Sequence, residues 1–213
     1  MDTPSLEFEK ELWLQGCRCV AGLDEAGRGA WAGPVVAAAV VLPRQRTDLL
    51  QVLEGVRDSK QLTARGREAL YPTILETALA VGIGLASARY IDNHRIVSAT
   101  RLAMVMALRN LGLGVDHLLI DALSLPEAGL PQHSLIKGDA AVLSIAAASI
   151  VAKVTRDQWM VSLDSYHAGY AFASNKGYGT AAHRAALHRL GPCPAHRMSF
   201  SPLWPYARHD SHR

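Results

Sequence analysis

Acidic residues lie where the predicted strands of a sheet end. Asp24 ends a short apolar run, Glu25 follows it directly, and Asp121 ends a later apolar run. Ligands of an open α/β sheet collect outside the carboxyl ends of its strands, and carboxylates gathered there repel one another unless a cation is bound. Hard oxygen ligands suit Mg²⁺ or Mn²⁺. The pattern therefore favours a divalent metal site.

The pairing of Asp24 with Glu25 leaves an alternative open. Neighbouring residues of a strand point to opposite faces, so both reach one site only if the chain distorts there. Gly27 and Gly29 permit such a turn. In the alternative, Glu25 faces solvent and Asp24 caps the following turn.

Asp139 comes directly before a long apolar segment that begins at Ala140. This position predicts a helix N-cap, a role that needs no catalysis, while a ligand role at a site facing the helix N-terminus stays open. The chain carries no phosphate loop, no dinucleotide-binding glycine pattern, no G-x-S-x-G and no H-E-x-x-H. Its three cysteines form no C-x-x-C pair, which argues against a disulfide framework or a zinc knuckle.

The elements that must position these residues alternate along the chain. We expect strands at 19–24, 34–42, 81–88, 117–121 and 134–136, and helices at 63–80, 92–112, 140–165 and 180–190. Asp92 is the expected N-cap of the second helix, and Pro72 is expected to break or kink the first. Strands in hairpin-like succession followed by alternating helices and strands predict an α/β fold with a mixed sheet.

The C-terminal part of the chain has its own composition. From Tyr166 onward, six Lys/Arg stand against one acidic residue, and seven of the 13 aromatic residues of the chain fall here. We therefore expect an α/β body at 1–165 and a small helical appendage at 166–213. A basic segment rich in aromatic residues suits a grip on nucleic acid, although a solvated basic tail is equally compatible with the charge alone.

Targeting features are missing from the sequence. The N-terminus is acidic, unlike a signal peptide, and the apolar runs 31–42 and 140–152 are shorter than the roughly 18 residues of a membrane span. We expect a cytoplasmic protein that does not associate with membranes.

Five ordered motifs resemble the signatures of the ribonuclease HII family. Together they extend from Val20 to Phe200, and they lie at 23–29 with 32–36, at 58–60, at 119–121, at 137–139 with 144–157, and at 175–180 with 196–200. The sister class, ribonuclease HIII, carries an extra N-terminal domain and lacks the Gly-Arg-Gly form found here at 27–29. With about nineteen residues before its first predicted strand, this chain fits the HII class.

The resemblance implies a ribonuclease-H-like fold, with a mixed five-stranded sheet flanked by helices. It implies endonucleolytic cleavage of RNA in RNA–DNA hybrids and 5′ of ribonucleotides embedded in duplex DNA, leaving 5′-phosphate and 3′-hydroxyl ends. It also implies that Asp24, Glu25, Asp121 and Asp139 hold two Mg²⁺ or Mn²⁺ ions. In this scheme Asp24 is the shared ligand, Glu25 and Asp121 lie on one flank, and Asp139 lies nearer the attacking water.

Substrate contacts follow from the same resemblance. The backbone of Gly27, Arg28 and Gly29 would read the 2′-hydroxyl, and the ring of Tyr178 would pack on the next sugar on the 3′ side. Three cations, Lys60, Lys153 and Arg156, are candidates for phosphate contacts. For the last two, a solvated helix face is the alternative.

The chain also departs from the family pattern. Arg95 replaces an asparagine that contacts the substrate backbone, Ala122 replaces a glycine, and the motif within 166–172 is blurred. After Phe200 we find no clamp-binding peptide, and we expect a monomer. Two competing functions are a DNA nuclease of the same fold, such as a resolvase, and a non-catalytic hybrid-binding module. Four intact carboxylates argue against the latter, because negative charge repels phosphates.

Overall fold

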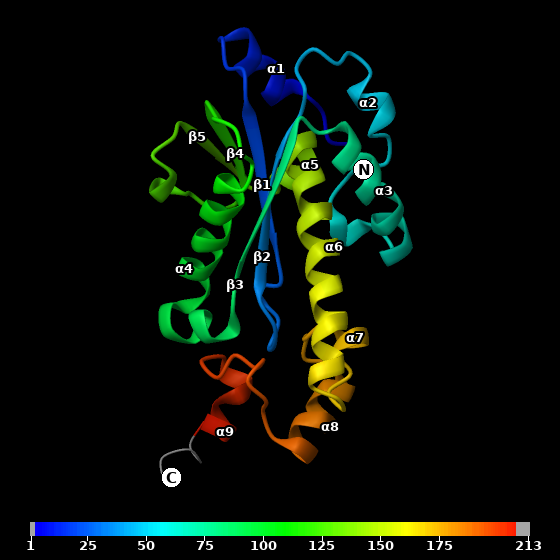
Figure 1. The fold of residues 1–213 in the computed structure, drawn as a ribbon, viewed down its shortest axis with the longest axis vertical. Coiled ribbons are helices and arrows are strands. Elements are labelled where there is room, and N and C mark those ends of the chain that lie inside the picture. Colours follow the sequence, from blue (N-terminus) through cyan, green and yellow to red (C-terminus); the bar gives the residue numbers. More distant parts are fainter. Residues whose placement is uncertain (1–2, 208–213) are drawn as a thin grey trace.

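A mixed five-stranded sheet organises the molecule, which a computed structural model describes over residues 3–207 (Figure 1). The strand order is β3-β2-β1-β4-β5. β1, β2 and β3 pair antiparallel, whereas β4 and β5 continue the sheet parallel to β1. The strands are β1 (Val20–Ala26), β2 (Val35–Val41), β3 (Ala80–Ala86), β4 (His117–Asp121) and β5 (Gln132–Leu135). The expected α/β class and mixed five-stranded sheet are confirmed.

Helices cover both faces of this sheet. They are α1 (Glu7–Leu14), α2 (Leu49–Val52), α3 (Ala64–Thr77), α4 (Ala88–Arg109), α5 (Gly138–Ala141), α6 (Leu143–Tyr166), α7 (Phe172–Asn175), α8 (Ala181–Leu190) and α9 (Trp204–Ala207). The all-apolar β2 is buried along its whole length because α6 packs on one of its faces and α4 on the other. α3 lies beyond α6 on the same side of the sheet (Figure 1).

Helix boundaries differ from the expected ones where local hydrogen bonds decide them. Ser87, not Asp92, caps α4, and its side chain accepts a bond from the amide of Tyr90. A kink at Arg95 separates the short N-terminal part of α4, residues 88–94, from the rest of the helix. Pro72 lies inside α3 without ending it.

α1 was not expected from the sequence, and it fixes the start of α6. Its Glu9 is fully buried and accepts a hydrogen bond from the amide of Ser144, 2.9 Å away, in the first turn of α6. Ser5 adds two backbone bonds to Ala141 and Leu143. The N-terminal segment therefore holds the joint between α5 and α6.

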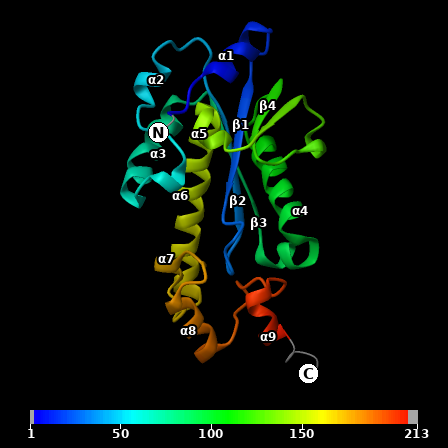
Figure 2. The ribbon, with the colours of Figure 1, turned by 180° about the vertical axis from the view of Figure 1, so that it is seen from behind.

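The C-terminal elements gather at one end of the sheet, opposite α1 (Figure 2). Tyr166, where the expected appendage begins, is the last residue of α6. The apolar cluster of this end combines Ala32 and Met160 of the expected body with Phe172, Leu187 and Leu203. The division into 1–165 and 166–213 stays a prediction, and the structure packs the two segments into one shared cluster.

Candidate active site

Asp24 and Asp121 lie side by side on parallel strands. In the register of β1 and β4, Leu23 is opposite Ile120, so the two aspartates come next on their strands. Strand alternation turns both toward the face covered by α5 and α6, because Ala26, two residues after Asp24, packs against α6. The sheet alone therefore brings two carboxylates to one place.

Asp139 reaches the same place from α5. The expectation that it caps the long helix is wrong, because Asp139 lies inside the short α5 and α6 begins only at Leu143. The turn between β5 and α5 is tied to the sheet, since the amide of Gly138 donates to Oδ1 of Asp121 at 2.7 Å. This bond fixes the orientation of Asp121 and the approach of Asp139 together.

The three carboxylates form one cluster. One oxygen each of Asp24, Asp121 and Asp139 lies within 4.8 Å of the others. Asp121 and Asp139 line a cavity of about 540 Å³, together with Asp58, Lys60 and Lys137. Nζ of Lys60 lies 3.5 Å from a carboxylate oxygen of Asp139, and its side chain is largely exposed.

Electrostatics show that this cluster lacks positive charge. Burial, together with the charges of Glu25 and Asp121, raises the pKa of Asp24 well above its usual value. Burial and then Asp121 raise the pKa of Asp139. Burial opposes the charged form of Lys60, but Asp139 and Asp24 outweigh it and raise the pKa of that ammonium. The buried Asp24 and Asp139 and the half-buried Asp121, with the exposed ammonium of Lys60 beside them, are a donor set that fits a hard divalent cation.

Glu25 occupies a different position from the three aspartates. Glu25 follows Asp24 on β1, which continues without a break to Ala26, and the charges of Asp121 and Lys60 act on its carboxyl group. Its Oε1 lies 3.2 Å from the guanidinium of Arg28, while its buried Oε2 has no partner among residues 3–207. Burial raises the pKa of Glu25, and Arg28 opposes that shift. Glu25 thus borders the cluster and keeps one unsatisfied oxygen.

The loop that follows β1 presents free backbone donors. Within residues 3–207, the amides of Arg28 and Gly29 donate no hydrogen bond to the protein. Gly27 has a φ of +94°, a value that glycine adopts without strain. The loop therefore offers two N–H groups next to the carboxylate cluster.

Tyr178 lies in the turn between α7 and α8 and is 37% exposed. Its ring lies close to two cations, with Nζ of Lys153 at 5.8 Å and Cζ of Arg156 at 5.4 Å from its centroid. One ring face is therefore supported by positive charge, and a third of the side chain remains accessible.

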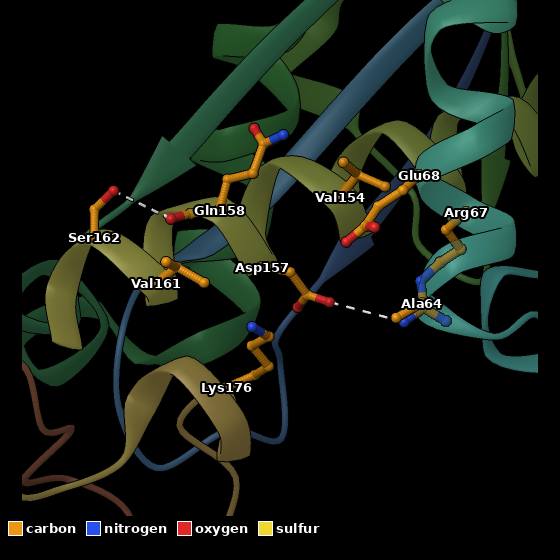
Figure 3. Close-up of a pocket in the computed structure, with 9 residues that line it drawn as sticks. All are labelled: Ala64, Arg67, Glu68, Val154, Asp157, Gln158, Val161, Ser162 and Lys176. Atoms are coloured by element: carbon orange, nitrogen blue, oxygen red, sulfur yellow. Dashed lines mark hydrogen bonds and ion pairs between the residues drawn. The ribbon is translucent and has the colours of Figure 1, made fainter.

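Lys153 is less available than the sequence suggests. It is half-buried and its Nζ lies 2.6 Å from Asp157, which also faces Arg67 at 3.8 Å. Figure 3 shows the ion pair between Asp157 of α6 and Arg67 of α3. Both residues line a cavity of about 350 Å³ that Lys176 also lines. A phosphate contact from Lys153 requires that its ammonium turn away from Asp157.

Arg156 is placed where no phosphate reaches it. The side chain is fully buried, and its guanidinium donates to backbone carbonyl groups inside the protein. For Arg156 the structure therefore contradicts both the expected phosphate contact and the alternative of a solvated helix face. The charge of an arginine gave no sign that three carbonyl groups would surround it.

Arg197 is a second buried arginine that sequence reasoning missed. It donates to the carbonyl groups of Gly33 and Arg28, each at 3.0 Å. Burial and the nearby charge of Arg156 lower the pKa of Arg197 to about 9. The following residues are held by Asp92, whose carboxylate accepts bonds from the amides of Met198 and Ser199. The resemblance of residues 196–200 to a ribonuclease HII motif was the one feature of the sequence that singled out Arg197.

Two of the three departures from the family pattern, Arg95 and Ala122, lie at unusual backbone positions. Arg95 is exposed, with φ 66° and ψ 161°, a region that is strained for any residue except glycine. Ala122 has a φ of 53°, directly after Asp121. Its neighbour Leu123 donates a backbone bond to Asp121 at 2.6 Å, which tightens this turn.

Comparison with known proteins gives consistent results. The model of the family described as ribonuclease HII matches residues 21–202. A ribonuclease HII of Roseiflexus castenholzii is 54% identical over 200 residues, which is 94% of this chain and 89% of the relative.

Across the part of the chain that the structure describes, no helix is both long and apolar enough to cross a membrane.

Solved structures agree with the fold. The ribonuclease H2 of Pyrococcus horikoshii has a TM-score of 0.75 and 27% identity, covering 89% of this chain and 97% of its own. The ribonuclease HII of Archaeoglobus fulgidus, solved in complex with PCNA, has a TM-score of 0.71 and 26% identity, covering 85% of this chain and 95% of its own. The expected ribonuclease-H-like fold is confirmed, and this chain belongs to the ribonuclease HII family.

Proposed function

We propose that this ribonuclease H cleaves the RNA strand of RNA–DNA hybrids and also cuts 5′ of single ribonucleotides embedded in duplex DNA. The products would be a 5′-phosphate and a 3′-hydroxyl. The observation that carries the proposal is the convergence of Asp24, Asp121 and Asp139, from three separate elements, within 4.8 Å of one another beside an open cavity.

The three aspartates would hold Mg²⁺ or Mn²⁺, with Glu25 as a further ligand. Bound ions of this kind activate water and stabilise the charge that develops on the leaving oxygen. The protein's own part is to keep the carboxylates fixed in advance. The amide of Glu25 holds Asp24, and the amide of Gly138 holds Asp121, both at 2.7 Å.

Other residues would position the substrate. Lys60, with its exposed ammonium beside Asp139, is placed to contact a phosphate at the edge of the cavity. The free amides of Arg28 and Gly29 are donors that suit a 2′-hydroxyl, which both donates and accepts hydrogen bonds. The accessible ring of Tyr178 suits packing against a neighbouring sugar.

One assay tests the proposal against its alternatives. End-labelled duplexes of DNA, of RNA–DNA hybrid, and of DNA with one ribonucleotide are incubated with Mg²⁺, with Mn²⁺ or with a chelator. We expect metal-dependent cleavage of the last two substrates only. Cleavage of plain DNA would favour the same-fold DNA nuclease, and binding of hybrid without cleavage would favour the binding module.

The partner and location expectations stay predictions. A monomeric, cytoplasmic protein is compatible with the fold, and the Archaeoglobus fulgidus relative was solved with PCNA. Residues 208–213, part of the tail in which we found no clamp-binding peptide, lie outside the described residues.

A further inference from the structure

Arg156 connects two segments that lie far apart in the sequence. Its Nε donates to the carbonyl of Pro34 at 2.9 Å, and one terminal nitrogen donates to the carbonyl of Ala32 at 3.1 Å. The other terminal nitrogen donates to the carbonyl of Lys176 at 2.9 Å. Two of these acceptors lie in the chain between Gly27 and β2, and the third lies in the turn that carries Tyr178.

The guanidinium also contacts both segments by packing. A side chain at Gly27 would overlap Nε of Arg156, so the loop approaches the guanidinium as closely as glycine allows. On the other side, Cζ of Arg156 lies 5.4 Å from the centroid of the Tyr178 ring. The same planar group therefore lies between the Gly27–Gly29 loop and Tyr178.

A backbone contact completes this connection. The carbonyl of Gly177 accepts bonds from the amides of Trp31 and Ala32, at 2.8 and 3.2 Å. A side chain at Gly177, where φ is +78°, would overlap the carbonyl of Ala32. Arg156, this tight backbone approach and the packing of Gly179 against the Trp31 ring thus hold the two segments together.

We propose that Arg156 is a positioning residue that sets the spacing between the Gly27–Gly29 loop and Tyr178, and thereby the preference for an isolated ribonucleotide. The inference rests on the proposed function, in which the loop contacts the 2′-hydroxyl and Tyr178 the next sugar. A long hybrid offers a 2′-hydroxyl at every position of one strand, so several registers are productive. A single ribonucleotide offers one register, and an error in the spacing has its full effect there.

The test compares Arg156→Lys with the wild type. Lysine keeps the positive charge, but its single ammonium lacks the planar fork that spans three carbonyl groups. Since small displacements of positioning groups cost up to roughly 100-fold in rate, we expect the ratio of kcat/KM for the single ribonucleotide to that for the long hybrid to fall at least about tenfold.

A matched control separates positioning from general destabilisation. Leu187→Ala removes buried apolar surface from the same C-terminal cluster and leaves every hydrogen-bonding group of Arg156 and its three acceptors unchanged. Thermal melts rank the loss of stability in both variants. The ratio should stay within about twofold in Leu187→Ala, and an equal fall in both variants would overturn the proposal.

Two further variants test how Arg156 acts. If it acts through Tyr178, adding Arg156→Lys to Tyr178→Ala should change the ratio no further, whereas independent, multiplying losses would overturn the proposal. Gly177→Ala forces the segments apart with Arg156 intact and should reproduce the loss of selectivity even if Arg156→Lys fails to fold. An unchanged ratio in Gly177→Ala would overturn it.

Failure of the proposed function gives a different result. If the wild type does not cut at a single ribonucleotide, or if Tyr178→Ala leaves the ratio unchanged, then the assigned substrate contacts are wrong and the inference falls with them. If Tyr178→Ala lowers the ratio and Arg156→Lys does not, only the positioning role of Arg156 is refuted.

Discussion

A buried histidine pair should make the protein sensitive to acid. Nδ1 of His183 lies 2.9 Å from the carbonyl of Tyr178, so this nitrogen must carry the proton, and Nε2 must accept. Nε2 of His196, 3.0 Å away, is then the donor, and its Nδ1 accepts from the amide of Cys193 at 2.9 Å. Both rings are neutral in this arrangement. A second proton on His183 would set two N–H groups against each other.

The expected loss of stability in acid can be calculated from the lowered pKa of His196. Burial, followed by the charge of His183, lowers the pKa of His196 from 6.5 to about 4. At ~1.4 kcal/mol per unit, this interval corresponds to about 3 kcal/mol of unfolding free energy. Above pH 6.5 neither state binds the proton and the full stability is present. As the pH falls from 6.5 toward 4, only the unfolded chain takes up the proton, and stability is lost.

Urea unfolding across this pH range measures the effect. Because many carboxyl groups titrate as well, the useful quantity is the difference in unfolding free energy between the wild type and His196→Gln. This difference should shrink by about 3 kcal/mol between pH 8 and pH 4. Leu190→Ala, at an exposed side chain of α8, changes no titratable group, so it serves as the control and should show a constant difference. A constant difference for His196→Gln would refute the reasoning.

Three further variants have defined outcomes. Tyr178→Ala should lose far more activity on a single embedded ribonucleotide than on a long hybrid, whereas equal losses with a lower melting temperature would indicate a purely structural tyrosine. Ala122→Gly should remove the strain of the positive φ, raising stability by about 1 kcal/mol and Tm by about 2–4 °C in a calorimetric scan, and a lower Tm would contradict this. Glu9→Gln should raise the unfolding free energy of the protein at pH 8 but not at pH 4. Burial raises the pKa of Glu9 above 4.5, so the native state loses stability as this carboxyl group ionises with rising pH. Destabilisation at pH 8 in urea titrations would show that the charge on Glu9 is favourable.

The sheet and the pair Asp24 and Asp121 were predictable because apolar runs and strand ends are local features of a sequence. The position of Glu25 was harder to predict from the sequence. β1 runs without a turn to Ala26, and the charges of Asp121 and Lys60 still act on the carboxyl group of Glu25. The place of Glu25 among the metal ligands therefore stays a prediction.

Long-range hydrogen bonds explain the remaining differences. Asp139 has the sequence context of a helix cap, yet Glu9, from α1, contacts the first turn of α6 instead. Arg156 and Arg197 have the charge of surface residues, yet each donates to two carbonyl groups that lie more than a hundred residues away in the sequence. Such partners are set by tertiary packing, and no local pattern contains them.

The most direct test of the account is cleavage by Asp24→Asn. Asparagine keeps the acceptor for the amide of Glu25 but removes a buried charge that Glu25 and Asp121 repel. We expect an end-labelled RNA–DNA hybrid to stay uncut with Mg²⁺ or Mn²⁺, while hybrid binding survives and the melting temperature does not fall. Asp48→Asn, which alters an exposed carboxylate paired with Arg46, should cleave like the wild type. Cleavage by Asp24→Asn above a few per cent of the wild-type rate would contradict the central role of this carboxylate.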